Sequence, residues 1–324
     1  MYGRCGGIDE ARRVFDAIAN KNVFSWTIIL TVYARSGHLD EAKFVFDTMP
    51  EKNVVSETTM IMAYAEAAKL DQAKIVFDSM QERNLFAWNA LITGHARHGH
   101  YKGALKLLQL MDLDGVRADR ITFLAIIESC SGLNDFRKAR LMHSRAGASG
   151  YALETKVANA LITMYGRFGA LDDATKVFCS IPTKNLLAWT ALVVAYARNG
   201  HMEQALEAFQ RMGLDGCQPD EIAFVGIISA CSHGGRVREG WHFMAEMYGE
   251  FGVGQKEEHY SCLVDMLGRA GLLDEAERFI QEVTVNVNPW KGRSLLLSWK
   301  SLLSSCRVQG DLELAHRVLT QVDR

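Results

Sequence analysis

Leu39-Asp40-Glu41-Ala42 and, two residues later, Val45-Phe46-Asp47 form a string that is repeated along the chain. It returns 31 residues further on as Leu70-Asp71-Gln72-Ala73 and Val76-Phe77-Asp78. Shorter versions of the same string begin at Val14, Leu171 and Leu273. Self-similarity at a fixed period of roughly 20 to 50 residues is the signature of stacked-repeat proteins. The period therefore predicts that repeats, and not one central core, organise this chain.

These strings mark one position of the repeat, and a second position is shared by Trp26, Glu57, Trp88 and Trp189. Aligning the chain on both positions divides it into units of 31 or 35 residues, with two units of irregular length at the end. The eight units are 23–53, 54–84, 85–119, 120–154, 155–185, 186–220, 221–256 and 257–288. A partial unit, 1–22, precedes them, and a divergent stretch, 289–324, with a further unit starting near Leu296, follows. Because Met1 falls inside the first helix of a unit, we expect the native chain to be longer.

Each unit is expected to form two helices. In 23–53, apolar residues recur at helical spacing from Trp26 to Tyr33, and a second apolar stripe runs from Leu39 to Met49. Gly37 separates the two stripes, and glycine fills the same slot at Gly6, Gly99, Gly169, Gly200, Gly235, Gly271 and Gly310, with Ala68 and Asn134 as exceptions. A left-handed helix end favours glycine there. One helix pair cannot bury its stripe alone, so the pairs should stack into an all-α solenoid without an enzyme pocket.

Composition narrows the function classes. The chain has 324 residues, of which 48% are hydrophobic and 23% charged, with only 4 Pro. This composition excludes collagen-like and disordered chains, and no apolar run approaches the roughly 18 residues of a membrane span. The 7 Cys are odd in number and form no C-x-x-C, so neither a disulfide framework nor a zinc finger is indicated. The acidic residues Asp9, Glu10 and Asp16 argue against a targeting peptide within this chain.

Several strings resemble the pentatricopeptide repeat family, in the plant type that mixes 31- and 35-residue repeats. They are Asn159-Ala160-Leu161-Ile162, Met164-Tyr165-Gly166-Arg167-Phe168-Gly169, Ser229-Ala230-Cys231-Ser232-His233 and Val264-Asp265-Met266-Leu267-Gly268-Arg269-Ala270-Gly271. The resemblance covers essentially the whole chain and implies a right-handed superhelix of helix pairs. The tail from Trp299 to Leu314 resembles the start of the extension found in organellar RNA-editing factors.

The resemblance implies binding of single-stranded RNA, one base per repeat, in a groove lined by the first helices. The fifth and last residues of each repeat are implied to choose the base. By the family's pattern, Thr27 with Asn53 and Thr58 with Asn84 favour adenine, Asn89 with Asp119 uracil, Asn159 with Asn185 a pyrimidine, and Thr190 with Asp220 guanine. Leu124 and Val225 hold the fifth slot of two long units, where we expect little selectivity because they cannot form hydrogen bonds.

The implied RNA, read 5′ to 3′ along the chain, is A-A-U-N-pyrimidine-G-N-(A), in which the last base comes from Ser261 with Asn288 of an irregular unit. The second residue of each repeat is implied to flank the base. In this sequence the flanking residues are Phe24, Val55, Phe86 and Leu187.

A recurring arginine can be identified from the sequence alone, without the resemblance to the family, and we call this set the arginine ladder. The thirteenth residue of five units is arginine, and the partial unit has arginine in the same slot: Arg4, Arg35, Arg97, Arg167, Arg198 and Arg269. Arginines at one phase of a solenoid can track a phosphate backbone even when the net charge is only −2. The alternative is a solvated helix end, where arginine complements the helix dipole.

The leading hypothesis is therefore a sequence-specific RNA-binding protein that recognises sites for C-to-U editing in mitochondria, or alternatively in chloroplasts. No H-x-E followed by P-C-x-x-C is present, so a deaminase or another editing cofactor would act in trans. We expect no enzyme activity, bound cofactor, metal or membrane partner. The histidines His95, His98 and His100 lack further metal ligands, and the tryptophans are expected to pack between helices. The alternative hypothesis is a helical scaffold that binds a protein or peptide.

Overall fold

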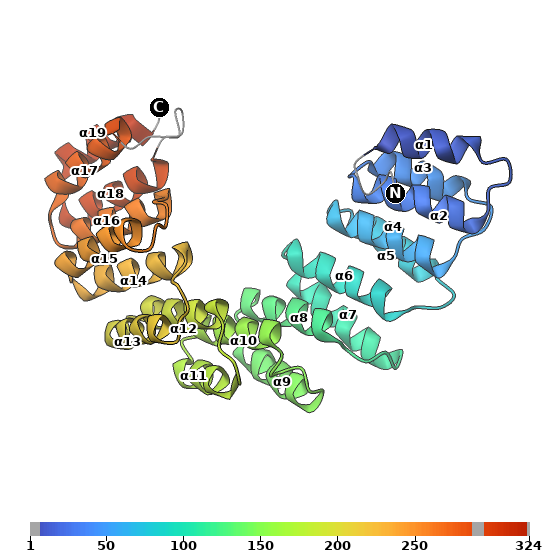
Figure 1. Cartoon of the computed structure of the whole chain (residues 1–324), viewed down its shortest axis with the longest axis horizontal. Coiled ribbons are helices and arrows are strands. Elements are labelled where there is room, and N and C mark those ends of the chain that lie inside the picture. The colour runs from blue at the N-terminus through green and yellow to red at the C-terminus, as the bar shows by residue number, and fades with distance from the viewer. Residues whose placement is uncertain (1–6, 287–294, 323–324) are drawn as a thin grey trace. The chain divides into compact units, whose positions relative to one another are not determined.

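The computed structural model describes residues 7–286 and 295–322, and every regular element within these ranges is an α-helix (Figure 1). The chain divides into two compact units, Met1–Ala152 and Leu153–Arg324. Gly6, Arg4 and Asn288, which carried sequence predictions, lie outside the described residues. None of the described helices is long and apolar enough to cross a membrane.

The first unit contains one leading helix followed by four helix pairs. Its helices are α1 (Ile8–Ala17), α2 (Val23–Arg35), α3 (Leu39–Thr48), α4 (Val54–Glu66), α5 (Leu70–Ser79), α6 (Leu85–Arg97), α7 (Tyr101–Leu113), α8 (Arg120–Gly132) and α9 (Phe136–Ala148). The first helices α2, α4, α6 and α8 pack against one another in series, and each packs against the second helix of its own pair. This is the nearest-neighbour packing of a solenoid.

The second unit contains five helix pairs with the same packing. Its helices are α10 (Thr155–Arg167), α11 (Leu171–Ser180), α12 (Leu186–Arg198), α13 (Met202–Leu214), α14 (Glu221–Gly234), α15 (Val237–Gly249), α16 (Glu257–Arg269), α17 (Leu273–Asn286), α18 (Leu296–Gln309) and α19 (Leu312–Val322). The last pair, α18 and α19, shares a core with α16 and α17 through Val264, Ile280, Leu302 and Leu314. The all-α solenoid prediction is confirmed for the described residues.

The first helix of most pairs ends in a left-handed residue, as the glycine slot predicted. Gly37, for example, has φ +77°, and Gly99, Gly169, Gly200, Gly235, Gly271 and Gly310 also have positive φ. The two exceptions adopt the same conformation, with φ 60° at Ala68 and 53° at Asn134. The tight turn is therefore imposed by the helix pair, and Ala68 adopts it at a steric cost that glycine would not have.

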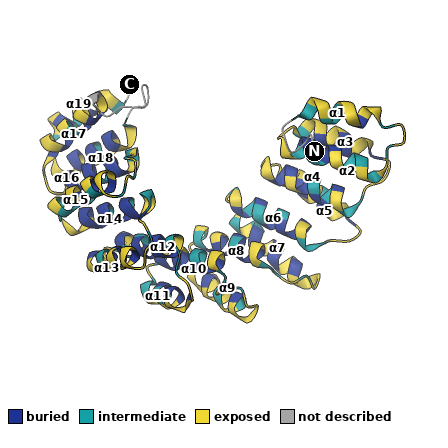
Figure 2. Ribbon diagram, viewed as in Figure 1, coloured by how far each residue is buried: buried dark blue, intermediate teal, exposed yellow. Residues whose placement is uncertain are grey.

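Aromatic pairs fill the space between consecutive helix pairs. Trp88 on α6 is almost fully buried and meets Phe77 on α5 edge-to-face at 4.5 Å between ring centroids, and Trp189 meets Phe178 at 4.6 Å. Trp26 repeats the contact with Phe15. Buried residues lie where neighbouring helices face one another in each unit (Figure 2). The prediction that these tryptophans pack between helices is confirmed, so they are not open platforms for a ligand.

Neighbouring first helices approach closely near their C-terminal ends. A Cβ atom on Gly166 would lie 2.5 Å from the Cβ of Ala195, so only glycine fits there. The same crossing is bridged by Asn199, whose Nδ2 donates to the carbonyl of Gly166 at 2.8 Å. In the first unit, His98 makes the equivalent bond through Nε2 to the carbonyl of Ala65 at 2.8 Å. These bonds satisfy carbonyls of the last helical turn, which the helix itself leaves without a partner.

Candidate functional site

The residue that precedes each first helix is asparagine or aspartate in most pairs, and its side chain caps the helix. Asn53 Oδ1 accepts from Ser56 N at 2.8 Å, and Asn84 Oδ1 accepts from Ala87 N at 2.8 Å. Asp119, Asn185 and Asp220 cap α8, α12 and α14 in the same way. Asparagine and aspartate are the preferred N-cap residues. These residues are therefore placed by helix formation itself, a role that the sequence analysis did not assign to them.

Three of the fifth residues lie within hydrogen-bond distance of the cap that begins the following pair. Asn89 Nδ2 donates to Asp119 Oδ1 at 3.0 Å, and Thr190 Oγ1 donates to Asp220 Oδ1 at 3.2 Å. Asn159 Nδ2 reaches Asn185 Oδ1 at 3.5 Å. The structure thus brings together residues 26 to 30 positions apart in sequence. We call each such couple, the fifth residue and the following cap, a polar pair.

The two threonine couples are arranged differently. Thr27 Oγ1 donates to the carbonyl of Val23 at 2.7 Å, and Thr58 Oγ1 donates to the carbonyl of Val54 at 2.6 Å. Among the described residues, no hydrogen bond joins either hydroxyl to Asn53 or Asn84. At these two positions the threonine hydroxyl is bonded to the backbone of its own helix.

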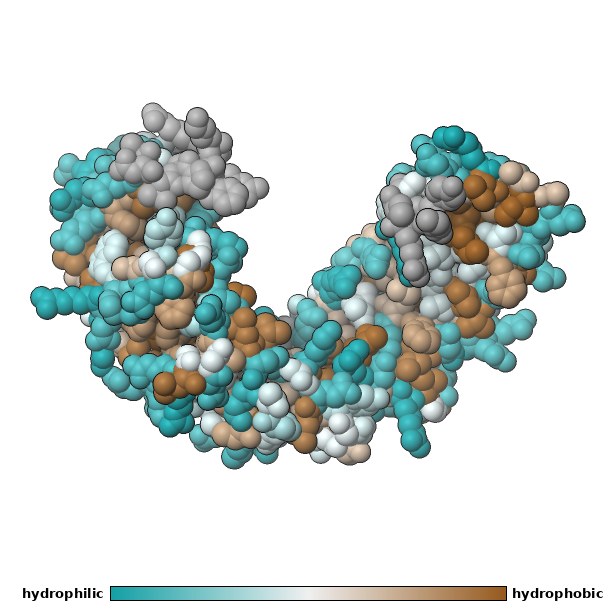
Figure 3. All heavy atoms as spheres, in the orientation of Figure 1, coloured by the Kyte–Doolittle hydropathy of each residue, from teal (hydrophilic) through white to brown (hydrophobic). Residues whose placement is uncertain are grey.

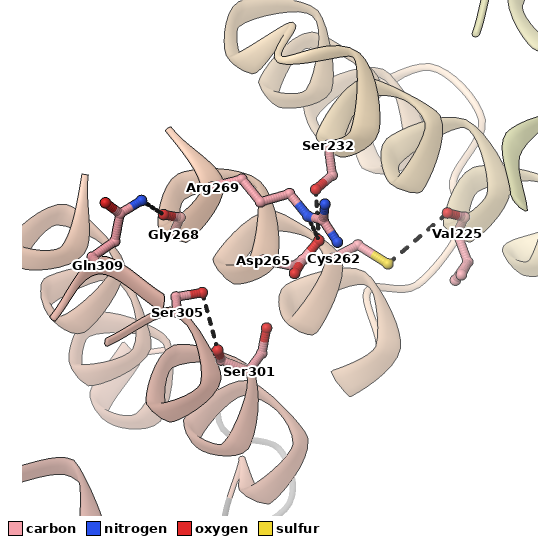
Figure 4. A network of polar contacts seen from close by, with 9 residues as sticks. All are labelled: Val225, Ser232, Cys262, Asp265, Gly268, Arg269, Ser301, Ser305 and Gln309. Atoms are coloured by element: carbon pink, nitrogen blue, oxygen red, sulfur yellow. Dashed lines mark hydrogen bonds and ion pairs between the residues drawn. The ribbon is translucent and has the colours of Figure 1, made fainter. Parts of the chain in front are cut away.

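The remaining fifth residues are Leu124 on α8, Val225 on α14 and Ser261 on α16. All three are half-buried. Leucine and valine offer no polar group, in line with the low selectivity expected from the sequence. Next to Val225, Cys262 Sγ donates a long contact of 4.0 Å to the Val225 carbonyl (Figure 4).

Exposed apolar side chains occupy the second position of most first helices, with Lys156 in α10 and Glu258 in α16 as exceptions. Phe24 is 76% exposed and Phe86 66% exposed, and Val55 and Leu187 are also exposed. Apolar groups open to solvent are visible on both units (Figure 3). Residues two and five are neighbours on a helix surface, so the apolar side chain flanks the polar pair. Ile121 and Ile222 occupy the same slot and are exposed, and the repeat phase alone would have identified them.

The thirteenth residues end the first helices. Arg35, Arg97, Arg167 and Arg198 are exposed, and none of them forms an ion pair with another residue in the described ranges. Eleven residues separate the second position from the thirteenth, which is three helical turns and about 16 Å. The arginine therefore lies on the same side of its helix as the exposed apolar residue.

Arg269 differs from these four arginines. Its Nε lies 2.8 Å from Asp265 Oδ2, which also accepts the hydroxyl of Ser232 at 2.7 Å (Figure 4). Asp265 is four residues before Arg269 on α16, so this i,i+4 pair was readable from the sequence. The charge of Arg269 is thus partly neutralised by Asp265. Among the five described arginines of the ladder, Arg269 is therefore the least available to a ligand.

Arginines on the opposite side of the helix pairs are neutralised across neighbouring repeats. Arg145 pairs with Asp112 at 2.7 Å, and Arg317 pairs with Glu277 at 3.0 Å. Arg236 pairs with Glu203 in the same way. These carboxylates lie on second helices. Four exposed arginines at the ends of first helices, Arg35, Arg97, Arg167 and Arg198, have no such carboxylate partner among the described residues.

His95 is half-buried, and Cys130 and Cys231 are buried, among the packed helices. His95 Nδ1 contacts the Leu91 carbonyl, and burial lowers the pKa of His95. Burial raises the pKa of Cys130 to about 11 and of Cys231 to about 12, so both remain thiols at neutral pH. Within the described residues, no group of three or more His, Cys, Asp or Glu side chains is placed to hold a metal ion.

Stacked helix pairs with a recurring polar pair define a protein of the α-solenoid class. A sequence profile described as PPR repeat family matches residues 83–132 and 184–233, and one described as PPR repeat matches residues 24–54, 58–85, 157–186 and 258–285. The chain therefore belongs to the pentatricopeptide repeat family.

Three relatives from Arabidopsis thaliana carry the same family name. One pentatricopeptide repeat-containing protein is 35% identical over 223 residues, which are 69% of this chain and 30% of that protein. A second, named mitochondrial, is 35% identical over 71% of this chain and 29% of its own length. A third, named chloroplastic, is 34% identical over 72% of this chain and 27% of its own length. The chain thus spans less than a third of these relatives.

Solved structures show the same fold. The pentatricopeptide repeat protein PPR10 in complex with an 18-nt psaJ RNA element matches with a TM-score of 0.69 and 19% identity, covering 99% of this chain and 53% of that chain. PPR10 from maize matches with a TM-score of 0.53 and 17% identity, covering 99% of this chain and 57% of that chain.

Proposed function

We propose that this chain binds single-stranded RNA, with one base read by each couple of a fifth residue and the following cap, the polar pairs among them. The observation that carries the proposal is one arrangement that recurs in repeats 85–119 and 186–220: a fifth residue hydrogen-bonded to the next cap, with an exposed apolar side chain beside it. Large exposed hydrophobic side chains at a fixed repeat position are typical of a binding surface. Stacking on such side chains and hydrogen bonding to an unstacked base edge is the usual recognition of single-stranded RNA.

The Asn89–Asp119 pair illustrates the chemistry. Asp119 Oδ1 already accepts from Asn89 Nδ2 and from Thr122 N, so Asp119 Oδ2 is left as the acceptor for a ligand. Asn89 Nδ2 retains a second proton. A carboxylate acceptor next to an amide donor complements the N3–H and a carbonyl of uracil. Cytosine would place its N3 lone pair against the carboxylate, so we propose uracil at this pair.

The other base assignments follow the same proposal. We keep adenine for Thr27 with Asn53 and for Thr58 with Asn84, a pyrimidine for Asn159 with Asn185, and guanine for Thr190 with Asp220. Arg35, Arg97, Arg167 and Arg198 would contact phosphates. The repeat boundaries given above, and the assignment of the stretch from residue 289 to an extension of the editing-factor type, are part of the proposal.

The cellular role we propose is site recognition for C-to-U editing of an organellar transcript, with the deaminase supplied by another protein and no catalytic step on this chain. Two observations support an organellar role: relatives of this chain are named mitochondrial and chloroplastic. The RNA complex of PPR10, which has the same fold, supports RNA as the ligand. We favour the mitochondrion and keep the chloroplast as the alternative.

The test is base preference. A panel of single-stranded RNAs based on A-A-U-N-C-G, each with one base changed, is titrated against the chain at fixed ionic strength, with a polyanion as the competitor. We expect the tightest binding for the designed RNA, and Asn89→Thr should move the preference at the third base from uracil towards guanine while leaving the others unchanged. Equal binding of all RNAs and the polyanion would refute the proposal and favour a protein-binding scaffold.

A further inference from the structure

A buried threonine, Thr122, contacts the amide oxygen of Asn89, while the cap Asp119 contacts the amide nitrogen. Thr122 is the third residue of α8 and is fully buried. Its Oγ1 donates to Asn89 Oδ1 at 2.6 Å across the boundary between two repeats. The same hydroxyl accepts from Asp119 N at 3.2 Å and has Asp119 Oδ1 at 3.0 Å. Thr122 therefore touches both members of the polar pair.

We infer that Thr122 is a positioning residue that fixes the orientation of the Asn89 amide and so sharpens the choice of base at this pair. The inference rests on the proposed RNA-binding function. An asparagine amide has two orientations of nearly equal shape, which exchange the donor and acceptor presented to a ligand. With Thr122 donating to Oδ1 and Asp119 accepting from Nδ2, only one orientation satisfies both partners. The reversed amide would place its oxygen against the carboxylate of Asp119.

The second unit contains a natural comparison without the hydroxyl. Asn159 pairs with Asn185, but the third residue of α12 is Ala188. The Asn159–Asn185 contact is longer, at 3.5 Å, and Asn159 Oδ1 is buried with no hydrogen-bond partner among the described residues. Asparagine in the fifth slot thus has a partner for both its oxygen and its nitrogen at Asn89, but only for its nitrogen at Asn159. The two repeats differ in the third residue, Thr122 against Ala188, and in the cap, Asp119 against Asn185.

Other hydroxyls in the third slot do not reach the fifth residue. Ser56 begins α4 in the equivalent place, but its Oγ donates to the carbonyl of Asn53 at 2.8 Å and accepts from Asn53 N at 3.0 Å. A hydroxyl in this slot is therefore not sufficient. It must meet an asparagine in the fifth slot of the preceding repeat, as Thr122 does with Asn89.

Because Thr122 fixes the amide, Asn89 presents a hydrogen-bond donor, and not an acceptor, to the base. When Thr122 holds the amide oxygen, Asn89 can offer only its remaining Nδ2 proton to a base, beside the acceptor Asp119 Oδ2. A uracil edge fits this order and a cytosine edge does not. Without the Thr122 hydroxyl, Asp119 alone orients the amide, so the reversed amide becomes more accessible and the preference for uracil over cytosine should shrink. The loss of one net hydrogen bond corresponds to about three- to tenfold in that preference.

The test uses Thr122→Val, which keeps the shape and removes the hydroxyl, with Thr122→Ser as the rescue variant and Ala188→Ser as the reciprocal gain. RNAs that differ only in uracil or cytosine at the third or fifth base are titrated against each variant after thermal melting has shown that it is folded. We expect Thr122→Val to reduce the uracil preference at the third base by about three- to tenfold, and Thr122→Ser to restore it. Ala188→Ser should enlarge the difference in affinity between the uracil and cytosine RNAs at the fifth base.

A second readout does not depend on RNA. In the free protein, the Asn89 side-chain amide protons should exchange more slowly with solvent in the wild type and in Thr122→Ser than in Thr122→Val, as followed by NMR. An unchanged uracil preference in Thr122→Val, with the wild type still preferring uracil, overturns the inference and leaves the proposed function standing. A wild type without any base preference overturns both.

Discussion

Single small residues decide how closely neighbouring first helices approach. A Cβ atom on Gly166 would lie 2.5 Å from the Cβ and 3.1 Å from the Cα of Ala195, so part of the obstacle is backbone. In the first unit, a Cβ atom added to Gly94 would lie 2.7 Å from the Cβ of Ala65, with the glycine on the later helix of the two. The crossing therefore requires a small residue on each helix, and the order of the two can be exchanged. This crossing sets the spacing of successive polar pairs within a unit.

Gly166→Ala should lower the stability of the second unit although alanine is the better helix former. Alanine gains about 1 kcal/mol in helix propensity over glycine, but forcing the helices apart costs about 1–3 kcal/mol. Gly213→Ala is the matched control, because Gly213 lies in α13 of the same unit, is exposed, and has no atom within 4 Å of an added Cβ. Denaturant unfolding should show a loss for Gly166→Ala and no loss for Gly213→Ala. Equal midpoints for the two variants would contradict the role given to the crossing.

At the level of the helix, the start of each first helix combines two roles. Asn185 and Asp220 cap the helices that follow them, and their side chains also face the fifth residue of the preceding first helix, Asn159 and Thr190. The cap fixes the side chain through a backbone N–H, so the group that meets a ligand is held before the ligand arrives. This reduces the entropy lost on binding. The same coupling means that an alanine at either position removes a cap worth about 1 kcal/mol together with the recognition group.

The start of α16 is built around a buried histidine instead of a capping asparagine. His259 Nδ1 accepts from Lys256 N at 3.1 Å, and its Nε2 contacts the carbonyl of Glu221 on α14 at 3.0 Å. Burial lowers the pKa of His259, against smaller opposing effects of Glu221 and Glu258. Protonation would place a second N–H against Lys256 N and so break the contact that begins the helix.

The second unit should therefore lose stability as the pH falls. Since the folded protein binds this proton less readily than the unfolded chain, the contribution is complete above the ordinary histidine pKa of about 6.5 and is lost progressively below it. The slope attributable to His259 is at most about 1.4 kcal/mol per pH unit. Unfolding between pH 7.5 and 5.5 should show a shallower pH dependence in His259→Asn than in the control His316→Asn, which changes an exposed histidine on α19. Parallel slopes in the two variants would count against this assignment.

The helices themselves were largely predictable, because apolar spacing and the glycine slot depend only on neighbours along the chain. The left-handed turns at Ala68 and Asn134 were placed correctly by phase although neither is glycine. The double role of Asp119 and the contact between Thr122 and Asn89 were not predicted. Both depend on which side chains meet across a repeat boundary, and Ser56 shows that the residue type alone does not decide it.

For the whole molecule, the distribution of charge matters more than its sum. The net charge is −2, yet Arg145, Arg236 and Arg317 are held by carboxylates of neighbouring repeats. The described arginines that end α2, α6, α10 and α12 have no such partner. Two of them belong to each unit. The sequence predicted six arginines in the ladder, but Arg4 lies outside the described residues and Arg269 is paired with Asp265.

Four free arginines predict a definite salt dependence. Each phosphate contact with single-stranded nucleic acid contributes about −0.7 to the slope of log affinity against log salt, so the four together should give about −3. Arg97→Gln and Arg198→Gln should each make the slope shallower by about 0.7 and weaken all RNAs of the panel alike, because phosphate contacts carry no base information. Arg238→Gln, on the second helix α15, removes the same charge away from the first helices and should leave the slope unchanged. If the control variant flattens the slope as much as Arg97→Gln does, the attraction comes from overall charge and the ladder has no separate role.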